Sequence, residues 1–423
     1  MADEPQTIDP EQLCVGLYVE LGLGWMEHPF AFNRFKIKSQ AQIDTLKRLG
    51  LKEIQYDPGK SDCLPLAAPA DDAPAPPPPP PPSKEELAAR AEKQARIERV
   101  AELRAGIKQV ERQFLQAADV LKKINRQLRS RPEETFEETD HLVSSLVAAA
   151  QAQGEMHLHA ISQGLGEDVY FHSLNVTVLS LLLGQSLRLK TEELHQLGLG
   201  AILHDVGLLE VPDAIAARRE GLSKPEQLIY EGHVRSGVKL GRRINLGDQA
   251  LAVIAQHHER ADGSGYPEGL SGAEISLAAR IVGLTNAYDN LCNPQDLAKA
   301  LTPYEALSYL FAKQRDKFDQ NLLRALIRNL GVYPPGTVVR LSNQRIGLTI
   351  SVNTKEALKP VVLLYDPDIP PEAALLLDLA AEPELKIAEG IKPGLLPREV
   401  FEYLNPRQRV TYAFDKQPGA LRR

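Results

Sequence analysis

The chain has 423 residues, of which 43% are apolar and 25% are charged, so its length and composition predict a soluble protein of two or three domains. Its formal net charge of −7 argues against a nucleic-acid-binding surface, which would be basic. An anionic small ligand stays possible, because a metal centre supplies positive charge locally. Three cysteines without a ligand pattern, an acidic N-terminus and the lack of an apolar stretch long enough for a bilayer predict a cytoplasmic protein with no membrane span.

Residues 1–66 predict a small α+β module, with strands in "CVGLYVEL" and "KEIQYD" and a helix from Ser39, its N-cap, to Leu49. Residues 67–83 follow as a Pro-rich linker that contains seven consecutive prolines, Pro76 to Pro82. Because proline fits neither a helix interior nor a central strand, this run predicts an extended, stiff spacer. A docking ligand for a partner protein is the alternative.

Residues 84–131 predict one long helix that carries a continuous apolar seam. The seam positions are separated alternately by three and four residues, which is the heptad spacing of a coiled coil. They are Val100, Leu103, Ile107, Val110, Phe114, Ala117, Leu121, Ile124 and Leu128. We therefore expect a homodimer through residues 97–130, although Gly106 lowers the helix propensity inside the seam. The alternative is an amphipathic helix that packs on its own chain.

Residues 132–332 are predicted to form a helical domain, and residues 333–423 a β-rich extension. Long apolar-periodic runs such as "NVTVLSLLLGQSL" indicate the helices. In the extension, "GTVVRLSNQRIGLTISVN" predicts two strands around "SNQR", and "KPVVLLYDPD" predicts a third. The sequence of the extension suggests no chemical role.

Five of the ten histidines fall in the helical domain in the company of carboxylates. They are His172, His204, His233, His257 and His258. Asp205 directly follows His204 in an apolar stretch, and Asp168 precedes His172 by four residues, on the same face of a helix. A buried ionised carboxylate needs a partner, which a cation, an arginine or a second histidine would provide. The other five lack such company, and we interpret them as structural: His28, His141, His157, His159 and His195.

The set combines imidazole nitrogens with carboxylate oxygens and contains no thiolate, which suits iron, manganese or zinc. It offers more ligands than one tetrahedral ion requires, so we expect two ions. Two ions a few ångströms apart hold a phosphate between them and activate a water for attack on phosphorus. The stretch "QHHERADGSGYPEGL", residues 256–270, agrees with this view, because two neighbouring histidines stand beside a loop rich in Gly and Pro that needs an unusual backbone path.

Two segments, "HDVGLLEVPD" and "HHERADGSGYPEGLSGAEISLAARIV", resemble the HD-GYP family of bacterial phosphodiesterases, a subset of the helical HD metal-dependent phosphohydrolases. The resemblance covers residues 140–331. The N-terminal module, with "VGLYVEL" and "WMEHPFAFNRF", resembles the small domain that often precedes HD-GYP domains. The resemblance implies a mainly α fold, hydrolysis of cyclic di-GMP to the linear dinucleotide and onward to GMP, and a centre of two or three ions, commonly iron.

Carried over by position, the resemblance also implies the residues of the site. The metal ligands would be Asp168, His172, His204, Asp205, His233, His257, His258 and Asn286, with His204 and Asp205 as the catalytic pair. The substrate-binding residues would be Gly265, Tyr266 and Pro267 at the site mouth, together with Asp289 and Lys299. We expect two divalent transition metal ions, iron or manganese in preference to zinc.

Several positions depart from the family pattern. Asp168 replaces a Glu, and Asn286 replaces an Asp that is a ligand in the family. Leu208 replaces a Lys that faces phosphate, and Gln295 replaces an Arg that grips phosphate, a loss that Lys299 would offset in part. A neutral amide holds a cation more weakly than a carboxylate, and the missing cations would have stabilised charge in the transition state. We therefore expect a cyclic-di-GMP phosphodiesterase of reduced activity.

Two alternatives stay open at this point. The first is a degenerate domain that binds cyclic di-GMP or serves as a scaffold for signalling protein partners through the long helix and the N-terminal module. The second is an HD phosphohydrolase that acts on another nucleotide. Turnover of cyclic di-GMP separates the first alternative from the enzyme, and a screen of nucleotides tests the second.

Overall fold

The computed structural model describes residues 6–24, 27–30, 32–67, 84–151, 158–161, 168–218, 221–352, 356–406 and 411–414. The chain divides into two compact units. The first consists of Met1–Ala101 with Tyr365–Leu375, and the second of Glu102–Leu364 with Leu376–Arg423. The predicted Pro-rich linker lies outside the described residues.

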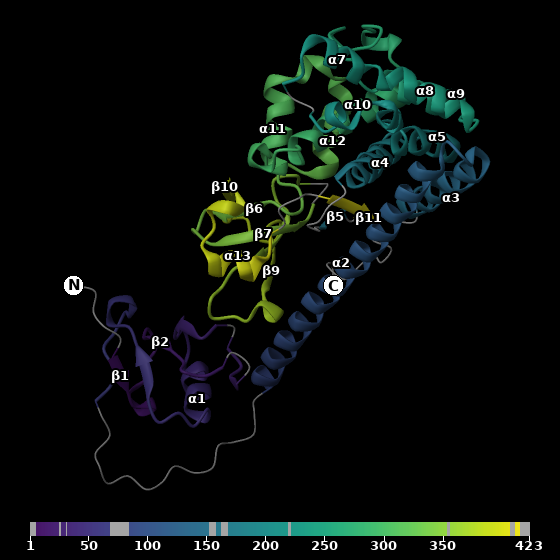
Figure 1. Cartoon of the computed structure of the whole chain (residues 1–423). Coiled ribbons are helices and arrows are strands. Elements are labelled where there is room, and N and C mark those ends of the chain that lie inside the picture. The colour runs from purple at the N-terminus through teal and green to yellow at the C-terminus, as the bar shows by residue number, and fades with distance from the viewer. Residues whose placement is uncertain are drawn as a thin grey trace. The chain divides into compact units, whose positions relative to one another are not determined.

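The N-terminal part of the first unit is a four-stranded antiparallel sheet with one helix (Figure 1). The strands are β1 (Gln6–Ile8), β2 (Tyr18–Glu20), β3 (Arg34–Lys36) and β4 (Ile54–Tyr56), in the order β1-β4-β2-β3, and the helix is α1 (Gln40–Arg48). Leu17, Leu46 and Ile54 are almost fully buried in its core. The predicted strands and helix are therefore confirmed. Ser39 stands at the N-cap, but its side chain makes no capping hydrogen bond.

Two cysteines that are far apart in the sequence meet in this module. The Sγ atoms of Cys14 and Cys63 lie 2.9 Å apart, and both side chains are half-buried. Backbone hydrogen bonds hold their segments together on either side, from Asp62 N–H to the Gly16 carbonyl (2.9 Å) and from Leu66 N–H to the Gln12 carbonyl (2.8 Å). This pairing was not predictable from the sequence, because it depends on the path of the chain through the sheet.

The long helix α2 (Lys84–Gln127) has the predicted extent, and the second half of its seam packs on its own chain. Leu121 and Ile124 are buried in the core of the second unit, and the ring of Phe114 stacks on that of Phe171 with centroids 5.6 Å apart. The intrachain alternative therefore describes this half of the seam. The homodimer through residues 97–130 stays a prediction.

The second unit is mainly α-helical (Figure 1). Its described residues contain one large apolar core. Its helices are α3 (Pro132–Gln151), α4 (Asp168–Ser186), α5 (Thr191–Ile202), α6 (Asp213–Ala216), α7 (Lys224–Glu231), α8 (His233–Arg243), α9 (Asp248–Gln256), α10 (Leu277–Cys292), α11 (Pro303–Lys313) and α12 (Gln320–Leu330). Helix α4 packs against α5 and α10, and α5 against α9. Helix α4 was predicted only as an apolar-periodic run, and the structure buries it along most of its length.

The C-terminal extension contains the predicted strands and one further pairing. β6 (Val338–Leu341), β7 (Ile346–Ser351), β8 (Val361–Leu364), β9 (Leu375–Asp378) and β10 (Ile387–Ile391) form a sheet in the order β10-β6-β7-β8-β9, followed by α13 (Arg398–Leu404). The "SNQR" turn joins β6 to β7, which confirms that prediction. The last strand, β11 (Thr411–Phe414), leaves this sheet and pairs with β5 (Leu158–Ile161), against α4. Among the described helices, none is long and apolar enough to cross a membrane.

We expect Leu121→Ala to lower the free energy of unfolding by about 2–5 kcal/mol, because it removes a buried side chain from a packed core. Leu115→Ala on the same helix is the matched control. Leu115 is 38% exposed, so its loss should be below about 1 kcal/mol. Urea denaturation followed by circular dichroism measures both. Equal losses in the two variants would contradict the packing of α2 on its own chain.

Candidate metal centre

The five predicted histidines and Asp205 come together in the second unit, and most of them lie at helix ends. His204 and Asp205 follow α5, where Asp205 begins the short 3-10 helix η4 (Val206–Glu210). His233 is the first residue of α8, and His257 is the C-cap of α9 with His258 directly after it. Packing of these helices brings their ends to one place, because η4 packs against α8, and α8 against α9.

Gly207 explains the closest of these contacts. A Cβ atom at this position would lie 1.8 Å from the carbonyl oxygen of His233 and 2.5 Å from the backbone nitrogen of Gly237. Backbone atoms cannot give way by such amounts, so only glycine lets the turn after Asp205 lie directly on the first turn of α8. This contact sets the spacing between Asp205 and His233.

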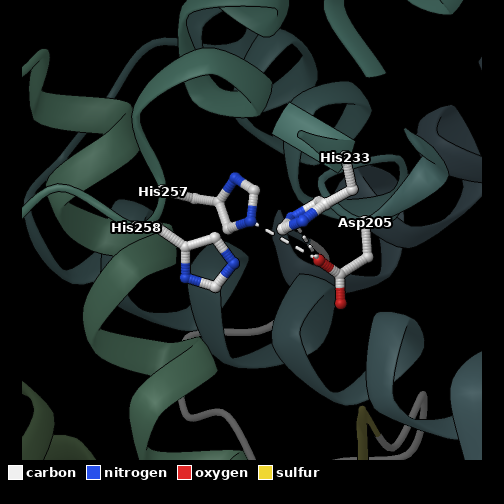
Figure 2. A group of neighbouring side chains, drawn as sticks. All are labelled: Asp205, His233, His257 and His258. Atoms are coloured by element: carbon white, nitrogen blue, oxygen red, sulfur yellow. Dashed lines mark ion pairs between the residues drawn. The ribbon is translucent and has the colours of Figure 1, made fainter. Parts of the chain in front are cut away.

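Asp205 lies at the centre of the cluster. Its Oδ1 is 3.4 Å from His257 Nε2 and 3.5 Å from His233 Nε2, as the dashed lines in Figure 2 show. Its Oδ2 is 3.4 Å from His204 Nε2 and 3.9 Å from His172 Nε2. Two groups of ligand atoms, each within 4.8 Å of one another, therefore share this carboxylate. They are Asp205, His233, His257 and His258, and His172, His204 and Asp205.

The imidazole rings are held so that their Nε2 atoms face the cluster. The Nδ1 atoms of His204, His233 and His257 lie 2.7, 2.6 and 3.0 Å from the carbonyl oxygens three residues earlier in the chain. A carbonyl oxygen only accepts hydrogen bonds, so each Nδ1 carries the proton and each Nε2 presents a lone pair. This arrangement is typical of histidines that bind a metal through Nε2.

Several of these buried atoms have no hydrogen-bond partner among the described protein groups. They are the Nε2 atoms of His172, His233, His257 and His258 and the Oδ1 of Asp205. Buried polar atoms without partners are costly, and lone pairs that face one another cannot satisfy one another. A cation between them would satisfy all of these atoms. The mixture of nitrogen and oxygen donors fits iron, manganese or zinc.

The titration of the cluster agrees with this donor set. Burial by itself would raise the pKa of the Asp205 carboxyl, but the neighbouring His204, His257 and His233 hold that pKa well below its usual range. Burial lowers the pKa of His257 to about 4 and brings that of His258 well below its usual range. At neutral pH the carboxylate is therefore charged and these two imidazoles are neutral, which are the protonation states that a metal requires.

Asp289, predicted to bind substrate, is buried behind His172. Its Oδ2 accepts a hydrogen bond of 2.6 Å from His172 Nδ1, and its Oδ1 accepts one of 2.9 Å from Asn293 Nδ2. Asp289 is 1% exposed, so its carboxylate is available to the protein rather than to a ligand in solution. It orients His172 as backbone carbonyls orient His204, His233 and His257.

The Gly-Tyr-Pro loop holds His258. A Cβ atom at Gly265 would lie within 2.6 Å of three backbone atoms of residues 258–260, so this position requires glycine. The Tyr266 ring stacks on that of His258 with centroids 4.5 Å apart, and the Tyr266–Pro267 peptide is cis. The buried carboxylate of Glu259 accepts hydrogen bonds from the backbone of Glu268 (2.8 Å) and Leu270 (3.0 Å) and ties the loop down. Sequence reasoning missed Glu259, although a Glu directly after two histidines was the signal.

The positions that depart from the family pattern have defined surroundings. Asn286 is buried on α10, and its Oδ1 accepts a hydrogen bond of 2.5 Å from Asn290 Nδ2. Leu208 is half-buried on η4. The Nε2 of Gln295 donates to the carbonyl oxygen of Ala217. Asp168 is the first residue of α4, and its side chain lies outside the described residues.

A pocket of about 550 Å³ is linked to the cluster through Tyr230, whose ring centroid lies 5.2 Å from that of His233. It is lined by Ala217, Arg218, Tyr230, Asn290, Pro294, Gln295 and Asp296. Two lining residues also hydrogen-bond to residues of the predicted site. The backbone carbonyl of Tyr230 accepts from His233 Nδ1, and Asn290 Nδ2 donates to Asn286 Oδ1. Arg218 is the cation among the described lining residues, and it pairs with Glu226. Lys299 is exposed and is not part of the lining.

The other histidines lie elsewhere. His28 is buried and bonds to Asn33 Oδ1 at 2.7 Å, and His195 lies 3.2 Å from Asp140 Oδ1. His141 is exposed on α3. His157 and the side chain of His159 lie outside the described residues.

Known proteins resemble this chain along most of its length. Residues 6–139 match a family model described as a domain of unknown function, DUF3391, and residues 167–322 match one described as an HD domain. The chain is 28% identical to the cyclic di-GMP phosphodiesterase PA4108 of Pseudomonas aeruginosa, over 84% of this chain and 83% of that protein. It is 35% identical to the cyclic di-GMP phosphodiesterase response regulator RpfG of Xanthomonas campestris pv. campestris, over 35% of this chain and 39% of that protein. A solved structure of Bd1817, an HDG"Y"P protein from Bdellovibrio bacteriovorus, aligns with a TM-score of 0.41 at 14% identity, over 76% of this chain and 98% of that one.

We expect protein made in medium supplemented with iron and manganese to contain at least one metal ion per chain. Changing His204 and Asp205 together to Ala should remove most of it, because Asp205 belongs to both groups of ligand atoms. His195→Ala is the control, since it removes a histidine outside the cluster. Elemental analysis of the three proteins measures the metal. A metal-free native protein, or a double variant that keeps its metal, would contradict the assignment of the cluster.

Proposed function

We propose that this chain, which belongs to the HD-GYP family of HD-domain phosphodiesterases, hydrolyses cyclic di-GMP at the cluster around Asp205. The single observation that carries the proposal is the sharing of the Asp205 carboxylate by two groups of inward-facing imidazoles. The substrate is chosen because a cyclic di-GMP phosphodiesterase resembles the chain over more than four fifths of both lengths.

The proposed cofactor is a pair of divalent transition metal ions, iron or manganese in preference to zinc. Asp205, His233, His257 and His258 would hold one ion, and Asp205, His172 and His204 the other, with Asp168 and Asn286 as further candidate ligands. When bound, such ions polarise a phosphodiester and lower the pKa of a water, so that attack on phosphorus becomes possible at neutral pH.

The surrounding residues would place the substrate. In the reaction, an oxygen of water forms a bond to phosphorus, the bond from phosphorus to the 3′ oxygen breaks, and that oxygen gains a proton. The pocket beside His233 has the volume for part of a dinucleotide and opens on Arg218. We propose that the Arg218 guanidinium binds a substrate phosphate, in place of the cations absent at Leu208 and Gln295. Tyr266 and Glu259 would keep His258 in position rather than contact the reacting atoms.

A degenerate binding module remains the second candidate, because specific contacts favour it. The Asn286 amide oxygen already accepts a hydrogen bond from Asn290, and the Gln295 side chain is tied to the backbone of Ala217. Both positions are therefore satisfied inside the protein without an ion or a phosphate. Such a module would bind cyclic di-GMP and not cleave it, and it would engage signalling proteins or a second copy through residues 97–130.

Asn286→Asp should raise both the metal content and the rate of cyclic di-GMP hydrolysis, the rate by about tenfold or more, because a carboxylate neutralises cation charge that an amide does not. Asn321→Asp, which adds the same charge at an exposed position of α12, is the control. Nucleotide turnover is measured together with elemental analysis. If metal is bound and neither wild type nor Asn286→Asp releases product, the protein is a binding module and not an enzyme.

Arg218→Ala should raise the KM for cyclic di-GMP about tenfold and change kcat less, because it removes a charged hydrogen bond to the bound substrate. Arg398→Ala is the matched control. Arg398 is also an exposed arginine paired with a glutamate, Glu402, but it lies on α13 in the C-terminal extension. Steady-state kinetics at equal metal loading measures both variants. An unchanged KM in Arg218→Ala would remove Arg218 from the substrate site.

A further inference from the structure

We infer that the C-terminal strand β11 is part of the metal centre, because a chain of buried hydrogen bonds runs from its backbone to His172. The inference rests on the proposed role of His172 as a metal ligand. It gives the C-terminal extension a function that its sequence did not suggest, namely to position a ligand that lies more than 200 residues earlier in the chain.

The chain of hydrogen bonds has three steps. The backbone N–H of Tyr412 donates to Asn175 Oδ1 at 3.0 Å. Asn175 Nδ2 donates to Asp289 Oδ1 at 2.8 Å, and Asp289 Oδ2 accepts from His172 Nδ1 at 2.6 Å. Tyr412, Asn175 and Asp289 are each at most 1% exposed, so water does not compete for these bonds.

Each of these three hydrogen bonds has a fixed direction. A backbone N–H only donates and a carboxylate only accepts, so the Asn175 amide has one orientation in which it satisfies both neighbours. In that orientation the amide holds the Asp289 carboxylate in place, and the carboxylate keeps the proton of His172 on Nδ1. The lone pair of His172 Nε2 is then directed to the side of Asp205, 3.9 Å from its Oδ2.

Further contacts hold Tyr412 in the position from which its backbone N–H donates to Asn175. Its hydroxyl lies 2.7 Å from that of Tyr288, which is fully buried on α10 next to Asp289 in sequence. The strand pairs in antiparallel register with β5, from Thr411 opposite Ile161 to Phe414 opposite Leu158. It also packs on α4, the helix that carries His172 and Asn175. The strand is thus anchored to both helices that supply the hydrogen-bond chain.

Removing the strand should therefore weaken metal binding. Without Tyr412, the Asn175 amide loses the backbone donor to its Oδ1, and Asp289, which also accepts from Asn293, then holds His172 less firmly. Loss of groups that orient a ligand typically costs about 10–100-fold in metal affinity. We expect the metal to leave about tenfold faster, while the helical unit stays folded because Tyr412 is the one described side chain that the strand contributes to its large apolar core.

The experiment compares three lengths of the metal-loaded protein: the full chain, a chain that ends at Phe414 and a chain that ends at Pro406. Each is dialysed against a chelator, and the remaining metal is followed by elemental analysis. The chain ending at Phe414 should keep its metal like the full chain, and the chain ending at Pro406 should lose it about tenfold faster. Equal rates for a folded chain ending at Pro406 would overturn the inference.

Two point variants keep the test decisive if the shorter chain does not fold. Asn175→Leu removes the middle of the hydrogen-bond chain and should also speed metal loss about tenfold. Tyr412→Phe removes the hydroxyl contact with Tyr288 but keeps the backbone N–H and the strand pairing with β5, which still holds that N–H in place, so its metal loss should stay close to that of wild type. Fast metal loss in both variants would indicate a packing effect. Slow metal loss in both would show that these hydrogen bonds do not support the metal site. A full-length protein that binds no metal would instead refute the proposed function itself.

Discussion

The buried carboxylate of Asp205 is the constraint on which the rest of the second unit depends. An ionised group that is 7% exposed, surrounded by imidazoles whose outer nitrogens are already bonded, is stable only if positive charge lies beside it. The helix ends that carry His204, His233 and His257 must therefore converge on one point. The apolar helices α4 and α5 supply the burial energy that holds those ends together.

The sequence was sufficient to predict that these histidines and Asp205 come together, and it was insufficient for the groups that support them. Histidines and carboxylates in an apolar helical region have few explanations, so the candidate ligands could be named from their company alone. Asn175 and Tyr412 carry no such signal, because an Asn in a buried helix and a Tyr near the chain end are common. Their roles depend on the pairing of β11 with β5, a contact between segments far apart in the chain.

The long helix shows why a clear pattern can have two structural outcomes. Alternating spacings of three and four residues describe an apolar stripe, and a stripe can be covered by a second helix of either the same chain or another copy. Phe171 on α4 covers Phe114, and the core covers Leu121, so the choice is made by surfaces that the heptad pattern does not contain. The strands around "SNQR" were predictable because both the alternation and the turn are local.

The departures from the family pattern do not all affect the same step. In the proposed site, Asn286 would remove negative charge from the metal centre, whereas Leu208 and Gln295 would remove positive charge from the substrate side. For a bound phosphate these changes partly cancel, since ions with fewer anionic ligands attract an anion more strongly. The binding of the ions has no such compensation. A neutral amide that already accepts a hydrogen bond from Asn290 would hold a cation more weakly than a carboxylate. Under the proposed function, the weak step should therefore be retention of metal rather than recognition of substrate, and the hydrogen bonds that link β11 to His172 would then affect activity through the metal.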